Sequence, residues 1–202
     1  MAGHSRYNIS KQGAGIQKGI LKNKLGITTQ KQLDDTETIL LSDAYTHFFE
    51  LHEMGKLVAE LQLLFDIHAY FLGPLYSWGG KVRTVDISKD NILFAPSHNI
   101  ESVLSDFEKI FNTNLPQLSD SKRIVAAKLA CIHAELNAIH PFREGNGRTI
   151  RLFLDLLAAH AGYHPIDWGK KSKIVYFKAC VLGMTKEYGP LTHLIFGGLS
   201  KK

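Results

Sequence analysis

One twelve-residue stretch, from His140 to Arg151, combines residue types that handle protons and anions. Its sequence is HPFREGNGRTIR. The run Gly145–Gly147 can give the backbone positive φ angles and direct N–H groups inward where a helix begins, and helix N-termini of this kind bind anions. Arg148 and Arg151 are spaced i and i+3, which predicts two guanidinium groups that reach the same anion from one helix face. A phosphate chain fits this arrangement better than a lone carboxylate.

The same stretch contains an acid and a base. Glu144 would repel a phosphate beside it unless a divalent metal lay between them, and Mg²⁺ takes one or two carboxylates plus phosphate oxygens. The alternative is an i, i+4 salt bridge from Glu144 to Arg148, and both states can occur if the ion pair forms without nucleotide. His140 can accept a proton near neutral pH, although its place at a helix C-terminus raises its pKa, so a base role needs local tuning.

The chemistry that these residues predict is phosphoryl or nucleotidyl transfer to an external hydroxyl. The stretch has no serine or cysteine of its own to act as a nucleophile. His140 would deprotonate the incoming hydroxyl while the anion site holds the nucleotide phosphates. Phe142 is expected to anchor the loop in the core.

Two strongly patterned helices must hold this loop. Residues 122–139 place apolar side chains at spacings of four and three, and Pro141 ends that helix. After Gly147 a second helix continues to Gly162. We expect further helices at about 16–25, 29 or 31 to 54, 57–77, 100–111, 170–186 and 190–196.

A change of period follows the third of these helices. Alternation on either side of the turn residues Ser88–Asn91 predicts a β-hairpin at about Lys81–Ala95 in an otherwise all-α fold. A two-stranded ribbon is marginal on its own, so the hairpin must lean on the helices or offer an edge to a partner.

Length and composition bound the class of protein. With 202 residues, 45% of them hydrophobic, the chain is expected to form one globular domain. A membrane span needs about 18 uncharged apolar residues, which the chain lacks, and its first residues contain no apolar signal segment. The expected location is therefore cytoplasmic. Cys131 and Cys180 lie in apolar helical patterns that indicate buried reduced thiols rather than metal ligands.

A net charge of +5 raises the question of nucleic acid as a partner. The charge is dispersed, and its denser spots are short and contain no interleaved aromatic residues. They are expected to be solvated helix faces, and no direct nucleic-acid binding is expected. These spots comprise Lys18, Lys22, Lys24 and Lys31, and Lys170, Lys171 and Lys173.

The segment His140–Arg151 resembles the signature of Fic-domain proteins, His-x-Phe-x-Asp/Glu-Gly-Asn-Gly-Arg-x-x-Arg, and fills every defined position. Residues 67–89 are similar to the helix, Trp-Ala-Gly turn and hairpin "flap" of that family, with Gly79 in place of the alanine. The resemblance extends over about residues 5–190. It implies a Fic-type helical bundle with a small β-hairpin flap: a single Fic domain over 1–202, with its core at about 57–186 and the flap at about 81–95.

The resemblance also implies an activity, which is the transfer of AMP from ATP to a Ser, Thr or Tyr hydroxyl of a target protein. By motif position His140 would be the base, Glu144 would hold Mg²⁺ and Arg151 would take the γ-phosphate. The remaining phosphate ligands would be Gly145, Asn146, Gly147 and Arg148. The flap would pair with a segment of the target as an added strand.

Many Fic proteins carry an inhibitory Ser/Thr-x-x-x-Glu-Gly/Asn motif whose glutamate engages the second arginine of the signature. This sequence has one Glu-Gly pair, Glu144-Gly145, with His140 four residues before it, so the motif is absent. The resemblance then points to short bacterial Fic toxins that a separate small antitoxin inhibits by supplying the glutamate. For such toxins it implies type II topoisomerase subunits as targets.

Two other functions stay open on the sequence alone. The same fold could use another donor group, as a kinase or a phosphocholine transferase, although the intact Gly147 argues against the kinase branch, which departs from the signature there. The chain could also be a nucleotide-binding module that is silent until a partner changes it.

Overall fold

The computed structural model describes residues 8–9, 15–17, 19–89, 92–170 and 172–202. These residues form seven α-helices and five short strands, which confirms the all-α fold with a small hairpin. The helices are α1 (Gln30–Glu53), α2 (Gln62–Leu72), α3 (Ile100–Asn114), α4 (Lys122–Ile139), α5 (Asn146–His160), α6 (Lys173–Met184) and α7 (Gly189–Gly198). The strands are β1 (Asn8–Ile9), β2 (Ile16–Gln17), β3 (Ile20–Leu21), β4 (Ile87–Lys89) and β5 (Ile92–Leu93).

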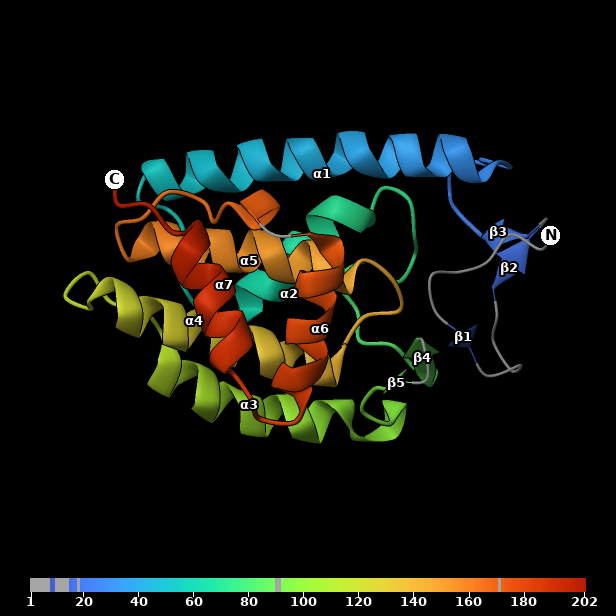
Figure 1. Ribbon diagram of the computed structural model, residues 1–202. Helices are drawn as coiled ribbons and strands as arrows, with labels where there is room; N and C mark the ends of the chain where they lie inside the picture. The colour runs from blue at the N-terminus through green and yellow to red at the C-terminus, as the bar shows by residue number, and fades with distance from the viewer. Residues whose placement is uncertain (1–7, 10–14, 18, 90–91, 171) are drawn as a thin grey trace.

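Helix α4 forms the centre of the bundle and has the bounds that the sequence predicts. It packs against α3, α5, α6 and α7, while α1 and α2 cover α5 (Figure 1). Its apolar stripe, which includes Leu129, Ile132 and Leu136, is fully buried. Ser121 caps the helix by accepting a hydrogen bond from the N–H of Ile124. The helix that leads into the signature loop therefore lies at the centre of the core.

The other predicted helices are present with shifted ends. Helix α1 begins after the N-cap Thr29 and stops before Gly55, whose φ of 66° ends it as expected. Helix α2 covers only the middle of the predicted 57–77 span and stops at Gly73, directly before Pro74.

The helix predicted at residues 16–25 is wrong. This segment is a β-hairpin in which β2 pairs with β3, with Ile16 opposite Leu21. Gly15 and Gly19 adopt φ angles of 45° and 82°, which interrupt a right-handed helix. Ile20 is 5% exposed, so the hairpin is anchored on the helical core.

The flap is shorter than its sequence pattern predicts and has a third strand. Strand β4 begins only at Ile87, because Arg83 turns its side chain into the protein and the carboxylate of Asp86 accepts a hydrogen bond from the N–H of Ser97. Strand β5 pairs with one edge of β4. The sequence did not predict that β1 pairs with the other edge, with Asn8 opposite Ser88.

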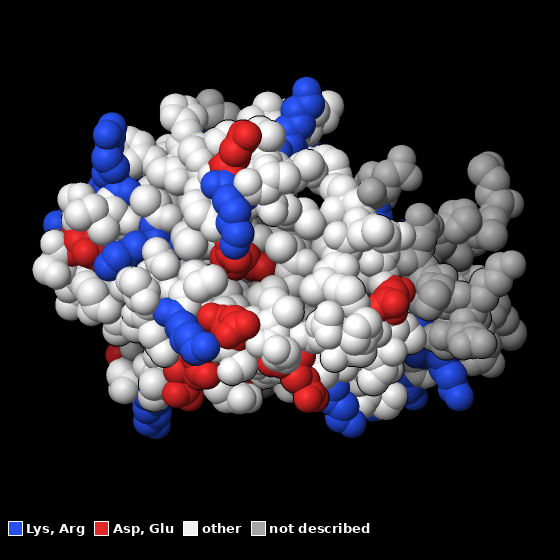
Figure 2. Space-filling model, turned by 90° about the horizontal axis from the view of Figure 1, so that it is seen from below, with Lys and Arg blue, Asp and Glu red and all other residues white. Residues whose placement is uncertain are grey.

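The surface carries mixed charges. Figure 2 shows basic and acidic side chains interspersed on one face, with no continuous basic area. Within the described residues, no helix is both long enough and apolar enough to cross a membrane. Both cysteines are free thiols: Cys180 is buried and Cys131 is half-buried.

Candidate active site

The signature loop between α4 and α5 is closed by its own asparagine. The Asn146 side chain accepts a hydrogen bond from the N–H of Phe142 at 2.8 Å and donates one to the Phe142 carbonyl at 2.6 Å. Phe142 is fully buried and stacks on His68 at 3.7 Å, which confirms its predicted role as the anchor of the loop. Gly145, with φ 81°, occupies the N-cap of α5. The loop therefore has a fixed shape before any ligand arrives.

His68 on α2 supports the signature loop by a hydrogen bond to its backbone. Its Nδ1 accepts a hydrogen bond from the N–H of Gly80 at 2.8 Å, so its Nε2 carries the proton and donates to the carbonyl of Glu144 at 3.0 Å. Burial lowers the pKa of His68 to about 4, which keeps the ring neutral. Sequence reasoning missed this residue, because a single histidine in a helical pattern has no signal of its own.

His140 ends α4 in the left-handed region, with φ 51° and ψ 61°. Its Nδ1 lies 3.0 Å from the carbonyl of Asn137, which can only accept, so Nδ1 carries the proton and Nε2 carries the lone pair. Phe94 of the flap stacks on the ring at 3.8 Å. Burial lowers the pKa of His140 to about 3, the opposite direction from the helix-end expectation, because desolvation outweighs the helix terminus. The neutral ring is the form that accepts a proton.

Arg83 joins the flap to the signature loop. Its guanidinium donates to the carbonyls of His140 and Val85, each at 2.8 Å, and to those of Ala95 and Ile139. The side chain is buried, and desolvation lowers its pKa. Sequence reasoning missed Arg83, because the carbonyls of Ala95, Ile139 and His140, which hold it together with that of the nearby Val85, carry no sequence signal, and Asp86 at i+3 lies only at the limit of ion-pair distance, 4.0 Å.

A cavity of about 150 Å³ lies between the flap, α4, α5 and α6. It brings together three of the predicted site residues: His140, Gly147 and Arg151. Its remaining lining comes from the flap (Lys89, Ile92, Phe94), from α4 (Asn137) and from α6 (Tyr176, Phe177, Cys180, Val181, Met184). We call it the catalytic cavity.

The two signature arginines occupy different surroundings. Arg148 does not line the catalytic cavity; its Nη1 lies 2.6 Å from Oε2 of Glu37 on α1, and its Cζ lies 5.0 Å from the ring centre of Phe71. The other oxygen of Glu37 accepts a hydrogen bond from Tyr76 at 2.8 Å. The i, i+3 spacing predicts that both guanidinium groups reach one anion, and the structure instead places them apart. The sequence did not reveal the partner of Arg148, which is Glu37, the eighth residue of α1.

Arg151 faces the catalytic cavity from the second turn of α5. Its Cζ lies 5.8 Å from the ring centre of Tyr176, whose hydroxyl is 2.7 Å from Nε2 of the buried His133. The N–H groups of Asn146 and Gly147, at the start of α5, have no acceptor within the helix. A cation and a helix N-terminus therefore converge on the cavity that contains His140.

Glu144 is the candidate metal ligand. It is buried, its Oε1 accepts a hydrogen bond from the N–H of Gly145, and the same oxygen lies 3.8 Å from Nη2 of Arg148. The i, i+4 ion pair between Glu144 and Arg148, which the sequence left open as an alternative to metal binding, is therefore present. In the part of the chain that the structure describes, no three His, Cys, Asp or Glu side chains gather as a metal site. One carboxylate beside a phosphate site fits Mg²⁺, which takes its other ligands from phosphates and water.

A helical bundle with this loop and flap defines a Fic-type fold, and comparison with known proteins shows the family. Residues 58–158 match the family model described as Fic/DOC family. The chain is 38% identical over 157 residues to protein adenylyltransferase VbhT of Bartonella schoenbuchensis, which covers 76% of this chain but 32% of VbhT. It is 32% identical to the probable protein adenylyltransferase Fic of Escherichia coli, over 74% of this chain and 72% of that protein. The chain belongs to the Fic/DOC family.

Solved structures share the fold. The BepC protein of Bartonella tribocorum with bound AMPPNP superposes with a TM-score of 0.73 and 23% identity over 90% of this chain and 93% of that chain. A Fic domain of Bartonella quintana with bound ADP superposes with a TM-score of 0.74 and 23% identity, over 95% and 94%.

Proposed function

We propose that this protein transfers AMP from ATP to a Ser, Thr or Tyr hydroxyl of a target protein. The observation that carries the proposal is the catalytic cavity, where the neutral His140, Arg151 and the N-terminus of α5 converge. Relatives named protein adenylyltransferase and solved Fic structures with bound AMPPNP or ADP support the choice of donor.

In the proposed mechanism the target hydroxyl attacks the α-phosphate of ATP, and pyrophosphate leaves. Nε2 of His140 accepts the hydroxyl proton, and the Asn137 carbonyl keeps the ring oriented through Nδ1–H. The N–H groups of Asn146 and Gly147 stabilise negative charge on the phosphates, because the positive φ of Gly145 lets the chain turn into α5 with these groups exposed. Arg151 binds the γ-phosphate.

The proposal assigns Mg²⁺ to Glu144. The ion would neutralise phosphate charge next to the carboxylate that now contacts Gly145 N–H and Arg148. Arg148 joins the phosphate ligands only if its guanidinium exchanges Glu37 for a phosphate oxygen.

The proposed target site is the free edge of β5. One edge of β4 is covered by β1, so within the β4–β5 hairpin the edge left for a target strand is that of β5. Lys89 pairs with Ile92, and only two residues of sequence separate them. The pair that closes such a short hairpin is the hydrogen-bonded pair, so in the next pair the backbone N–H and C=O of Leu93 point away from β4. Ala95, with the same orientation, donates to the carbonyl of Ala138 on α4. An added strand at Leu93 therefore lies next to the helix end that carries His140.

Transfer of label tests the activity. The protein is incubated with a bacterial lysate, Mg²⁺ and ATP labelled with ³²P at either the α- or the γ-phosphate. AMP transfer labels a target band only from α-labelled ATP, whereas a kinase labels it from γ-labelled ATP. The His140→Ala variant should lose at least about 100-fold in rate, since general-base catalysis is worth 10²–10⁴-fold. Equal labelling by this variant would contradict the assigned role. ATP binding by calorimetry without any label transfer would favour the silent nucleotide-binding module.

We further propose that the protein is a cytoplasmic bacterial toxin that a small antitoxin inhibits. No Ser/Thr-x-x-x-Glu-Gly/Asn motif occurs in the 202 residues, and the described residues that line the catalytic cavity beside Arg151 include no Asp or Glu. We assign the glutamate for Arg151 to a second protein. Expression of the chain should arrest growth, and His140→Ala should relieve the arrest. Purified type II topoisomerase subunits are the first targets to test by α-label transfer.

A further inference from the structure

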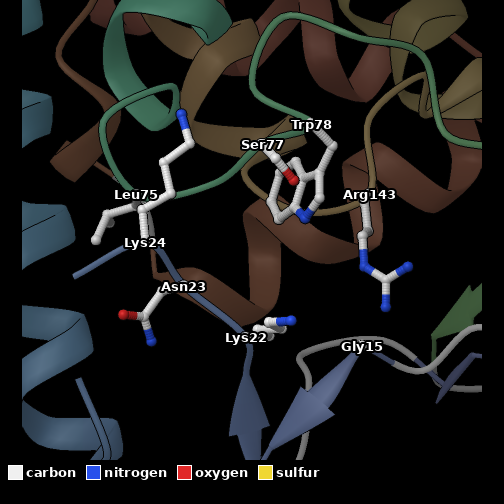
Figure 3. Close-up of a pocket in the computed structure, with 8 residues that line it drawn as sticks. All are labelled: Gly15, Lys22, Asn23, Lys24, Leu75, Ser77, Trp78 and Arg143. Atoms are coloured by element: carbon white, nitrogen blue, oxygen red, sulfur yellow. The ribbon is translucent and has the colours of Figure 1, made fainter. Parts of the chain in front are cut away.

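A second cavity borders the signature loop and shares no lining residue with the catalytic cavity. Its volume is about 360 Å³, within the range of small-molecule sites. Three segments form it: the end of the β2–β3 hairpin, the loop after α2, and Arg143 of the signature (Figure 3). We call it the basic pocket and define it by Lys22, Lys24, Ser77, Trp78 and Arg143.

The lining of the basic pocket is cationic. Three of the residues that line it, Lys22, Lys24 and Arg143, carry positive charge, and none of its described lining residues is acidic. The sequence pattern placed the lysines on a solvated helix face, and the hairpin instead brings them to a cavity wall; Lys18 lies outside the described residues. A concave site with charges of one sign concentrates ligands of the opposite sign.

The wall that carries both lysines is fixed rather than loose. The Asn23 side chain accepts a hydrogen bond from the N–H of Ile27 and donates one back to its carbonyl, both at 2.9 Å. The N–H of Lys24 donates to the carbonyl of Leu75 at 2.8 Å, which joins the hairpin to the loop after α2. The Lys24 ammonium group donates to the Gly73 carbonyl at 2.6 Å and keeps further N–H donors. A preorganised charged wall binds an anion at a lower entropic cost than mobile lysines do.

Trp78 gives the pocket a flat apolar surface. Its indole stacks on Tyr76 with 4.3 Å between ring centroids and an interplanar angle of 11°, so its plane is fixed. Figure 3 shows Arg143 and Lys24 on either side of the indole, with Lys22 below it.

We propose that the basic pocket binds a small phosphorylated compound, with its phosphate between Lys22 and Arg143 and a ring against Trp78. The site is separate from the ATP site of the proposed function, and its Arg143 directly precedes Glu144 in the signature loop. An acidic peptide fits less well, because a peptide needs an extended groove and this cavity is compact.

The indole N–H signals of the two tryptophans, Trp78 and Trp168, report on the site in ¹H–¹⁵N NMR spectra of the full chain. A Trp168→Phe variant assigns the Trp78 signal. Titration with AMP and with inorganic pyrophosphate should shift the Trp78 signal, whereas a shift of the Trp168 signal, whose ring contacts Tyr176 of the catalytic cavity, reports binding at that other site. Lys22→Ala and Arg143→Ala should each weaken binding about tenfold, the size expected for a charge-assisted hydrogen bond.

Two matched variants separate the sites. Lys81→Ala removes an exposed lysine that does not line the pocket, and Arg151→Ala removes the cation of the catalytic cavity; both should leave the Trp78 response unchanged. The proposal is overturned if neither probe shifts Trp78 at 10-fold excess over a millimolar protein sample. It is also overturned if Arg151→Ala abolishes the shift while Lys22→Ala does not, or if only a hexaglutamate peptide binds.

Discussion

The signature loop and the flap face the same catalytic cavity but are built in opposite ways. In the loop, the side chains of Asn146 and His68 hold backbone groups with buried hydrogen bonds, and Phe142 is fully buried. The flap consists of strands of two and three residues, and Leu93 is 81% exposed. Arg83 is the buried link between them.

The difference matches the roles that we propose for the two regions. Proton transfer and phosphate binding need atoms placed within a fraction of an ångström, so the loop is fixed in advance. The strand addition that we propose for the target needs exposed N–H and C=O groups and tolerates many side chains, and the open edge of the flap meets that need. The following changes test this contrast, from the largest expected effect on stability to the smallest.

Acid should destabilise the rigid side of the molecule. Burial lowers the pKa of His68 to about 4 and those of His133 and His140 to about 3, so these residues bind protons below pH 6.5 only after unfolding. Burial raises the pKa of Asp155 to about 6, so the folded state gains one proton in the same range. Unfolding near pH 5 then takes up about two protons net, and stability falls by up to about 2.7 kcal/mol per pH unit as pH decreases.

The measurement is the free energy of urea unfolding at pH 5, 6, 7 and 8. The slope should be steep between pH 5 and 6 and small above pH 7, and His133→Gln should reduce it by about one proton equivalent. A slope above pH 7 as steep as that below pH 6 would contradict the neutral state of these histidines.

Removing the two hydrogen bonds between Asn146 and Phe142 should lower the free energy of unfolding nearly as much as acid does. Asn146→Ala leaves the buried N–H and C=O of Phe142 without partners, which we expect to lower stability by about 3 kcal/mol. Asn114→Ala is the control, because that side chain only donates to a carbonyl of its own helix, and it should cost under about 1 kcal/mol. Urea unfolding of both variants measures the difference. Equal losses would show that the loop is not held in this way.

Arg83→Lys should loosen the link between loop and flap. A lysine cannot reproduce the planar fork that reaches four carbonyls, so we expect a stability loss of about 2 kcal/mol and a roughly tenfold lower kcat for label transfer. The KM for ATP should stay the same, since Arg83 does not line the catalytic cavity. Arg123→Lys on the exposed start of α4 is the matched control. A purely structural role would leave kcat per folded molecule unchanged.

A substitution on the open edge of β5 should slow target labelling but hardly change the free energy of unfolding. Leu93→Pro removes the outward N–H of β5, and we expect about tenfold slower target labelling with a stability change within about 0.5 kcal/mol. ATP affinity measured by calorimetry should not change. Leu93→Ala retains the N–H and should label the target at near the original rate. If alanine impairs labelling as much as proline does, the leucine side chain rather than the backbone edge recognises the target.

The sequence predicted most of what depends on local pattern. The bounds of α4, the loop with its glycine N-cap and the buried Phe142 all follow from periodicity, Pro141 and glycines. Of the turn residues expected at Ser88–Asn91, Ser88 and Lys89 belong to β4, and residues 90 and 91 lie outside the described part of the chain. The helix predicted at residues 16–25 was wrong because an apolar run of that length does not distinguish helix from hairpin, and Gly15 and Gly19 decided for the hairpin.

What the sequence could not show are contacts between distant segments. Arg148 lies one turn from Arg151, yet Glu37, 111 positions earlier, holds it in another environment. Arg83 is placed by carbonyls of two segments, and carbonyls carry no sequence information. Desolvation likewise reversed the expected pKa shift of His140, because burial depends on packing around the ring rather than on its helix position.

The pairing of β1 with β4 makes the flap a composite of two parts of the chain, residues 8–9 and residues 87–93. An affinity tag, a fusion partner or a protease cut near residues 8–9 would therefore act on the sheet that we propose as the target site, although His140 lies more than 130 positions away. Comparisons of target range between preparations are sound only when their amino ends are identical. Tags at the carboxyl end leave this sheet intact.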